Sequence, residues 1–305
     1  MRRMHMVSGG GFAAVVVAAS LWGTIGVATQ AIFAVDRASP LFVNLLRMAI
    51  ATPVLALISW RMIGRRMLAV RRRDLLLMAL SGALLAVSQA AYYAAIRQVG
   101  VSVATLLAVC VAPVIVTALS VMLRYETFSR KSAVALVCAV VGSVLLVGRH
   151  SDGGDGMTNV VLGTLLSLVA AVTYAGTIVC GRFLAADSHP LQVMTVMFAV
   201  GTVTILVLGS TSGITPLATP AGWMLVLYLG LVPTACAYTL FQVGLRSVPA
   251  TVASIVAMLE PLVAAILAWS FLGETLPAIG VVGAALLMLS ILLLSTNEEK
   301  RTSAA

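Results

Sequence analysis

The sequence predicts an all-α membrane protein with ten transmembrane helices arranged as two inverted-topology repeats of five helices. Three observations support this fold class: the apolar composition, ten apolar stretches of bilayer-spanning length, and motifs that recur 148 residues later. Of the 305 residues, 61% are apolar and 10% are charged, whereas soluble domains average about 45–50% apolar and about 25% charged residues. The chain therefore has too little polar surface to coat a water-soluble domain.

Apolar stretches follow one another along the whole chain, and each has about the 20 residues that a bilayer-spanning helix needs. The first five stretches lie at residues 11–35, 40–60, 75–97, 101–123 and 132–148. The second five lie at residues 159–183, 191–209, 221–244, 250–272 and 277–296. Only short connections remain between them, which excludes large soluble domains.

A Gly/Asp-rich segment separates the two sets of five stretches and predicts a linker over residues 149–158. It lacks the full ligand series, ending in a glutamate, that a calcium loop requires. We therefore expect a first five-helix repeat over residues 1–148, a second over 159–297, and a cytoplasmic tail over 298–305.

Lysine and arginine are distributed unevenly between the two sides of the predicted bundle. When the connections alternate across ten helices, fifteen basic residues fall on the side of the N-terminus, three fall on the other side, and Arg47 lies within the second helix. Positive residues concentrate in cytoplasmic loops, so both termini are expected in the cytoplasm and the protein in the cell inner (plasma) membrane. The net charge of +9 then reflects topology, and no nucleic acid is expected as a partner.

The two halves share motifs at a fixed spacing. Pro113 and Glu126 in the first half recur as Pro261 and Glu274, each 148 residues later. Because each repeat contains five helices, an odd number, the second copy must insert upside down. Inverted repeats are typical of secondary transporters, whose substrate site lies near the midplane between the repeats.

Several of these motifs resemble a known family. They are Leu259-Glu260-Pro261-Leu262 with Leu272-Gly273-Glu274, the first-half copy Ala112-Pro113-Val114 with Tyr125-Glu126, and the segments Ala19-Ser20-Leu21-Trp22-Gly23 and Leu46-Arg47. On these residues the chain resembles the drug/metabolite transporter superfamily, and within it the ten-helix EamA-type exporters. The resemblance implies export of amino acids, other metabolites or drugs, with aromatic amino-acid exporters as a plausible subgroup. Ala112 stands where the second copy has Glu260, so the resemblance does not imply two symmetric carboxylates.

Two ionisable residues fall inside predicted helices: Glu260, near the centre of the ninth, and Arg47, in the second. A charge inside the bilayer is costly and is a functional candidate for that reason. Glu260 is a candidate proton or amine site, and Arg47 a candidate partner for a substrate carboxylate. The alternative for both is a buried, hydrogen-bonded anchor between helices. Proline removes a backbone hydrogen bond, so Pro113 and Pro261 are expected to kink the helices that line the path.

Polar and aromatic side chains inside the predicted helices form a second group of candidates. Tyr and Trp away from the membrane interface need a hydrogen-bond partner or a wet cavity. Each residue alone could equally be packing, but together they suit an amphipathic substrate with an aromatic or apolar part. The group comprises Trp22, Asn44, Tyr92, Tyr93, Tyr174, Tyr238 and Gln242.

The motifs of several other protein classes are missing from the sequence. It contains no GxxxxGK[ST] phosphate loop and no HExxH motif, so ATP-driven transport, a zinc site and an enzyme are not expected. We expect no cofactor and no metal. The predicted function is a secondary or facilitative transporter that exports aromatic or neutral amino acids, or similar small metabolites, by alternating access. Export of drugs or other metabolites, and a passive channel-like facilitator, remain alternatives. The expected partners are the small-molecule substrate and the lipid bilayer, and the oligomeric state stays open.

Overall fold

The computed structural model describes residues 9–36, 38–124, 129–147, 160–209, 217–272 and 278–302. All regular elements in these ranges are helices. The predicted linker at 149–158, together with Glu126 and Glu274, lies outside the described residues.

The described residues of the first half form four α-helices and one short 3₁₀ helix. Their bounds are α1 (Gly9–Val35), α2 (Pro40–Ile63), η1 (Gly64–Leu68), α3 (Arg72–Met122) and α4 (Arg130–Val147). The start of α2 follows from its sequence, because the Ser39 side chain accepts a hydrogen bond from the Phe42 N–H and Pro40 occupies the first turn. Serine is a favoured N-cap and proline is tolerated in the first turn of a helix.

The second half contains more, shorter helical elements. Their bounds are α5 (Val160–Ala185), α6 (Pro190–Gly209), α7 (Pro220–Leu229), η2 (Gly230–Cys236), α8 (Ala237–Gly244), α9 (Ala250–Ala257), α10 (Leu259–Leu272) and α11 (Ala278–Thr302). Within the described residues, eight helical segments are long and apolar enough to cross a membrane. Helices α4 and α11 complete the ten predicted crossings. Helix α11 also continues to Thr302, into the region expected to be a tail.

The third and fourth crossings are joined more tightly than the sequence suggested. Two separate stretches were expected at 75–97 and 101–123, but they form α3, in which Gly100 interrupts the helical dihedrals with φ +77° and ψ 166°. A positive φ is accessible to glycine because it has no Cβ. A single glycine therefore turns the chain where a short loop was expected.

The two prolines expected to kink helices differ in their effect. Near Pro261 the helix is interrupted at Met258, between α9 and α10. This is one turn before the proline, where its ring meets the carbonyl of the residue four positions earlier. Around Pro113, in contrast, α3 keeps helical dihedrals, and the Thr117 hydroxyl donates to the Pro113 carbonyl at 2.8 Å. The sequence did not distinguish these two outcomes.

A π-helical segment interrupts the eighth crossing, which was expected as one regular helix over 221–244. Segment η2 contains Pro233, and the Thr234 hydroxyl donates to the Leu229 carbonyl, five residues earlier, at 2.7 Å. π-Helical turns are rare and occur frequently at functional sites. Here the segment ends directly before α8, which carries Tyr238.

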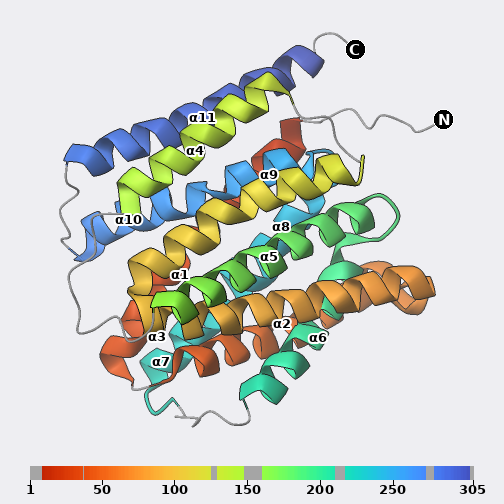
Figure 1. Cartoon of the computed structure of the whole chain (residues 1–305). Coiled ribbons are helices and arrows are strands. Elements are labelled where there is room, and N and C mark those ends of the chain that lie inside the picture. Colours follow the sequence, from red (N-terminus) through yellow and green to blue (C-terminus); the bar gives the residue numbers. More distant parts are fainter. Residues whose placement is uncertain are drawn as a thin grey trace.

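Close glycine contacts pack the helices and reveal the repeat. Gly82 of α3 lies against the Met197 backbone of α6, and Gly230 of η2 lies against the Arg47 carbonyl of α2. Gly82 and Gly230 are 148 residues apart and their partners Met197 and Arg47 are 150 residues apart, so the two contacts correspond to each other in the two halves. At one edge of the bundle α4 and α11 lie side by side (Figure 1), and Gly142 and Gly283 each face the backbone of the other helix.

The described ends of the chain lie together. Figure 1 shows α1 beginning and α11 finishing at the same end of the bundle, as ten crossings require. Segment η1 and the start of α3 bring Arg65, Arg66, Arg72 and Arg73 to the inner end predicted from the charge distribution. We call this the arginine-rich end.

At the opposite end, Asp36 ties α1 to α7. Its carboxylate accepts hydrogen bonds from the Thr219 hydroxyl at 2.6 Å, the Ala218 N–H at 2.8 Å and the Thr219 N–H at 3.3 Å. Gly222 leaves room for this carboxylate, since a Cβ there would collide with it. The hydrogen bond from the Thr219 hydroxyl, followed by that from the Ala218 N–H, lowers the pKa of Asp36 below its ordinary value of 3.8.

We expect D36N to lower the unfolding temperature at neutral pH, because asparagine has no charge and only one acceptor oxygen. A carboxylate with a lowered folded-state pKa stabilises the protein above its unfolded pKa, and the effect disappears as the pH falls through the folded pKa. The difference between D36N and wild type should therefore be full at pH 7 and begin to shrink only as the pH falls below about 4, toward the lower folded-state pKa of Asp36. Thermal unfolding in detergent between pH 3 and 7 measures it. D187N, at an exposed aspartate, is the control, and an equal effect of both variants would contradict the account.

Candidate functional site

Glu260 lies in the first turn of α10 and faces the interior of the bundle. Its carboxyl group interacts electrostatically with Arg47 of α2, and with Tyr93 of α3, Tyr174 of α5 and Tyr238 of α8. These neighbours come from four helices, so the structure brings together predicted residues from both halves. We call these five residues the polar centre.

The Glu260 carboxylate has no fixed partner. Among the described residues it forms no hydrogen bond, and no ion pair within 4.0 Å joins it to Arg47. Its side chain is also only partly buried, like those of Tyr93 and Tyr174. The groups that surround it belong to other helices of the bundle, so the carboxylate lies between helices. A ligand, proton or water entering there meets an unpaired carboxylate.

Arg47 presents a buried cation opposite this carboxylate. Its side chain is 3% exposed, its guanidinium lies close to the Tyr238 hydroxyl, and its Nε atom has no hydrogen-bond partner. Asn44 lies one turn earlier on α2 and is completely buried, with neither amide atom hydrogen-bonded. The buried Trp22 Nε1 of α1 also has no partner. Each unpaired polar group costs about 1–3 kcal/mol, which a suitable ligand could recover.

An aromatic cluster borders the polar centre. The ring of Trp22 lies 4.7 Å from that of Tyr238 and 5.1 Å from that of Phe241, and Phe198 of α6 meets Tyr238 edge-on at 5.3 Å. Aromatic pairs prefer such tilted and edge-on arrangements, with centroids 4.5–7 Å apart. The cluster therefore forms a defined apolar wall beside the charged groups.

Two predicted candidates have partners within the protein. The Tyr92 hydroxyl is hydrogen-bonded to the Thr105 hydroxyl at 2.6 Å, although the Tyr92 ring also lies 5.7 Å from that of Tyr93. The Gln242 amide donates to the Gly181 carbonyl at 2.8 Å and joins α8 to α5. These contacts support the helix-anchor alternative for Tyr92 and Gln242. Their role in transport stays a prediction.

Sequence reasoning missed several residues beside the site. Phe198 and Phe241 complete the aromatic wall, and Thr105 fixes Tyr92. Nothing in an apolar helix distinguishes a wall phenylalanine from a core one. Gly23 was visible as part of the segment that carries the resemblance. A Cβ at Gly23 would lie 2.6 Å from the Val263 Cβ and 2.9 Å from the Glu260 carbonyl oxygen, so this glycine lets α1 approach the break beside Glu260.

We expect G23A to destabilise the protein by about 1–3 kcal/mol, the usual cost of overpacking, and to reduce transport by displacing α10. Gly26, one turn later on α1, supplies a matched control because a Cβ there would meet nothing within 4 Å. Thermal unfolding and transport should both be impaired in G23A and be close to wild type in G26A. Equal behaviour of the two variants would contradict the proposed packing role.

The arrangement offers a cation, an unpaired carboxylate and an aromatic wall within one interior region. These groups complement a small molecule that carries opposite charges and an apolar part. Among the described residues, no group of three or more His, Cys, Asp or Glu side chains is placed to hold a metal ion.

Comparison with known proteins agrees with this architecture. Residues 9–148 and 161–296 each match the model of the EamA-like transporter family. The uncharacterized transporter YwfM of Bacillus subtilis is 31% identical over 290 residues, covering 95% of both chains. The uncharacterized inner membrane transporter YicL of Salmonella typhimurium is 26% identical over 297 residues, covering 95% of this chain and 97% of its own. A solved crystal structure superposes with a TM-score of 0.81 at 17% identity, covering 95% of this chain and 98% of the other, and shows the shared fold.

Proposed function

Because the chain belongs to the EamA-like transporter family, we propose that it exports aromatic or neutral amino acids, or similar small metabolites, from the cytoplasm. One observation carries the proposal: Arg47 and Glu260 lie near each other inside the bundle without pairing within 4.0 Å. Opposite charges inside a protein normally pair closely, since their desolvation is otherwise uncompensated. A zwitterion placed between them would satisfy both.

The ligand would bind with its charged ends separated. Its ammonium group would face Glu260 and the tyrosines, and its carboxylate would face Arg47. Asn44 and the Trp22 Nε1 have unused hydrogen-bonding capacity. Its side chain would lie against Trp22, Tyr238 and Phe241. This wall favours an apolar or aromatic side chain over a sugar.

Alternating access between the inverted repeats would carry the substrate across the membrane. The break between α9 and α10 and the π-helical η2 both adjoin the site, and irregular helices are where such motions concentrate. The excess of basic residues supports a plasma-membrane orientation with both termini in the cytoplasm.

Uptake of a panel of labelled amino acids into proteoliposomes, with and without a pH gradient, tests the proposal. Saturable uptake of aromatic or neutral amino acids is expected, and stimulation by the gradient would assign proton coupling. Non-saturable uptake would favour the channel-like alternative. Failure of folded protein to move any amino acid, combined with movement of cationic drugs, would overturn the substrate assignment.

A further inference from the structure

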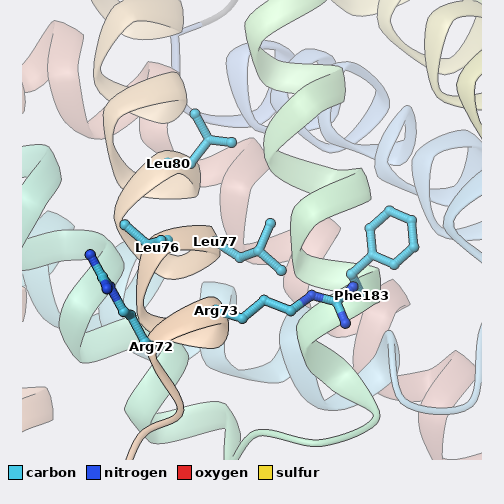
Figure 2. Close-up of a pocket in the computed structure, with 6 residues that line it drawn as sticks. All are labelled: Arg72, Arg73, Leu76, Leu77, Leu80 and Phe183. Atoms are coloured by element: carbon cyan, nitrogen blue, oxygen red, sulfur yellow. The ribbon is translucent and has the colours of Figure 1, made fainter.

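An open groove lies at the arginine-rich end, between the start of α3 and the end of α5 (Figure 2). It encloses about 530 Å³, within the range of small-ligand sites. Its lining consists of Arg72, Arg73, Leu76, Leu77, Leu80 and Phe183. In Figure 2 the two arginines leave α3 on different sides, and Arg73 reaches across toward α5 beside Phe183.

Because the repeats are inverted, the groove can be compared with the equivalent junction of two helices at the other end of the bundle. At the end of the bundle opposite the groove, the end of α1 meets the start of α7, and the Asp36 carboxylate joins them by accepting hydrogen bonds from Ala218 and Thr219. The equivalent elements at the other end are α5 and α3, because α3 and α7 begin 148 residues apart. The residue directly after α5 is Ala186, where Asp36 directly follows α1, and the next residue, Asp187, is exposed and forms no hydrogen bond with a described residue. The hydrogen-bonded Asp36 carboxylate therefore has no counterpart between α5 and α3, and the groove lies at the equivalent place.

The charges around the groove are unpaired. Arg72 and Arg73 are exposed, and neither forms a hydrogen bond or an ion pair with a described residue. Asp74, the nearest acidic residue in the sequence, is partly buried and forms no ion pair with them. Two cations at a membrane-interface position are thus available to an external anion.

The floor of the groove is apolar and exposed. Leu76 and Leu80 are 62% and 48% exposed and face the same opening as Leu77 and Phe183. Basic pockets between transmembrane helices bind anionic lipid headgroups, and a continuous leucine surface beneath the cations suits an acyl chain. A soluble phosphate would leave this surface unused, and a neutral lipid would leave the arginines unused.

We propose that this groove binds an anionic glycerophospholipid, with its phosphate between Arg72 and Arg73 and an acyl chain along Leu76, Leu77, Leu80 and Phe183. The lipid bridges α3 and α5, as the Asp36 carboxylate bridges α1 and α7 at the other end. The proposal concerns neither the transported substrate nor the polar centre, so it stands independently of the proposed function.

Lipid titration of the purified full chain, followed by native mass spectrometry, tests the proposal. Phosphatidylglycerol should bind in preference to phosphatidylcholine. The double variant R72Q/R73Q should weaken phosphatidylglycerol binding about 30-fold, as expected for the loss of two charges that hold an anionic lipid. The double variant R65Q/R66Q removes the same charge at the same end but outside the groove, and should bind the lipid like wild type.

Two further measurements distinguish the chemistry of the ligand. L80Q should weaken phosphatidylglycerol binding although it removes no charge, and glycerol 3-phosphate should not compete at equal concentration. Competition by glycerol 3-phosphate would mean a phosphate site and overturn the lipid assignment. Equal loss in R72Q/R73Q and R65Q/R66Q would mean general surface attraction and would also overturn it. Unchanged unfolding temperatures in lipid-free detergent verify that the variants fold.

Discussion

Replacement of Glu260 by glutamine is expected to reduce pH-gradient-driven transport to the level of empty liposomes while leaving the protein folded. Glutamine keeps the size of the side chain and can still form hydrogen bonds. It cannot take up and release a proton, and it has no negative charge to act as counter-ion to an ammonium group. Glu260 forms no hydrogen bond or ion pair with described residues. Its neutralisation therefore breaks no close contact, although it removes the longer-range attraction to Arg47. Proteoliposome uptake with an imposed pH gradient measures the effect.

Two comparisons make this prediction specific. D187N removes an exposed carboxylate and should transport like wild type. E260D keeps the charge on a shorter side chain and should retain part of the activity. Unchanged gradient-driven transport in E260Q would refute the role of Glu260 in coupling, and unchanged saturable binding would also remove it from the substrate site.

Replacement of Arg47 by methionine is expected to raise the KM for amino acids by about 10- to 100-fold, the range expected when a charged hydrogen bond is lost. Methionine is a suitable replacement because α2 and α6 begin at Pro40 and Pro190, 150 residues apart, which aligns Arg47 with Met197 of the second repeat. The Met197 backbone packs on Gly82 as the Arg47 backbone packs on Gly230. The variant therefore removes the cation at a position where the fold already accommodates methionine.

The substrate itself supplies the control for R47M. The corresponding amine without a carboxylate cannot use Arg47, so its KM should be similar in R47M and wild type. R47K should be intermediate, because lysine keeps the charge but lacks the planar fork of guanidinium donors. An equal rise in KM for the amino acid and the amine would mean that Arg47 acts through structure and does not bind the carboxylate.

The ten crossings and the inverted repeat could be predicted from the sequence because the physical constraints on them are strong. A bilayer admits few structures other than apolar helices of fixed length, and the five-helix period determines that the second copy is inverted. The candidate status of Glu260 and Arg47 followed from the cost of a charge in lipid. Glu260 was expected to be a proton or amine site and Arg47 a partner for a substrate carboxylate, and the structure places the two within electrostatic range of each other.

Local irregularities were predictable only in part. A proline marks a place where a helix is weakened, but the surrounding packing decides the result: the helix breaks at Met258 before Pro261, continues through Pro113, and becomes π-helical around Pro233. Gly100 was likewise not recognised as the whole connection between two crossings. A single proline or glycine makes an interruption of the helix more favourable, and tertiary contacts select the conformation that results.

Side-chain partners could not be read from the sequence at all. Gln242 and Asn44 are both buried polar amides within predicted helices, yet Gln242 is paired with the Gly181 carbonyl and Asn44 is unpaired. Which carbonyl faces which amide depends on helix rotation and crossing, which hydrophobic periodicity does not determine in a chain that is apolar on nearly every face. The aromatic wall formed by Phe198 and Phe241 was missed for the same reason.

Counterflow of a labelled aromatic amino acid, competed by related unlabelled compounds, tests the central claim most directly. Proteoliposomes of the wild-type protein would be assayed with the intact amino acid, its amine lacking the carboxylate, and its acid lacking the amine. We expect strong competition by the intact zwitterion and much weaker competition by either singly charged compound, because Arg47 and Glu260 each require one charge. Equal competition by all three compounds, or none by the zwitterion, would contradict a substrate held between these two residues.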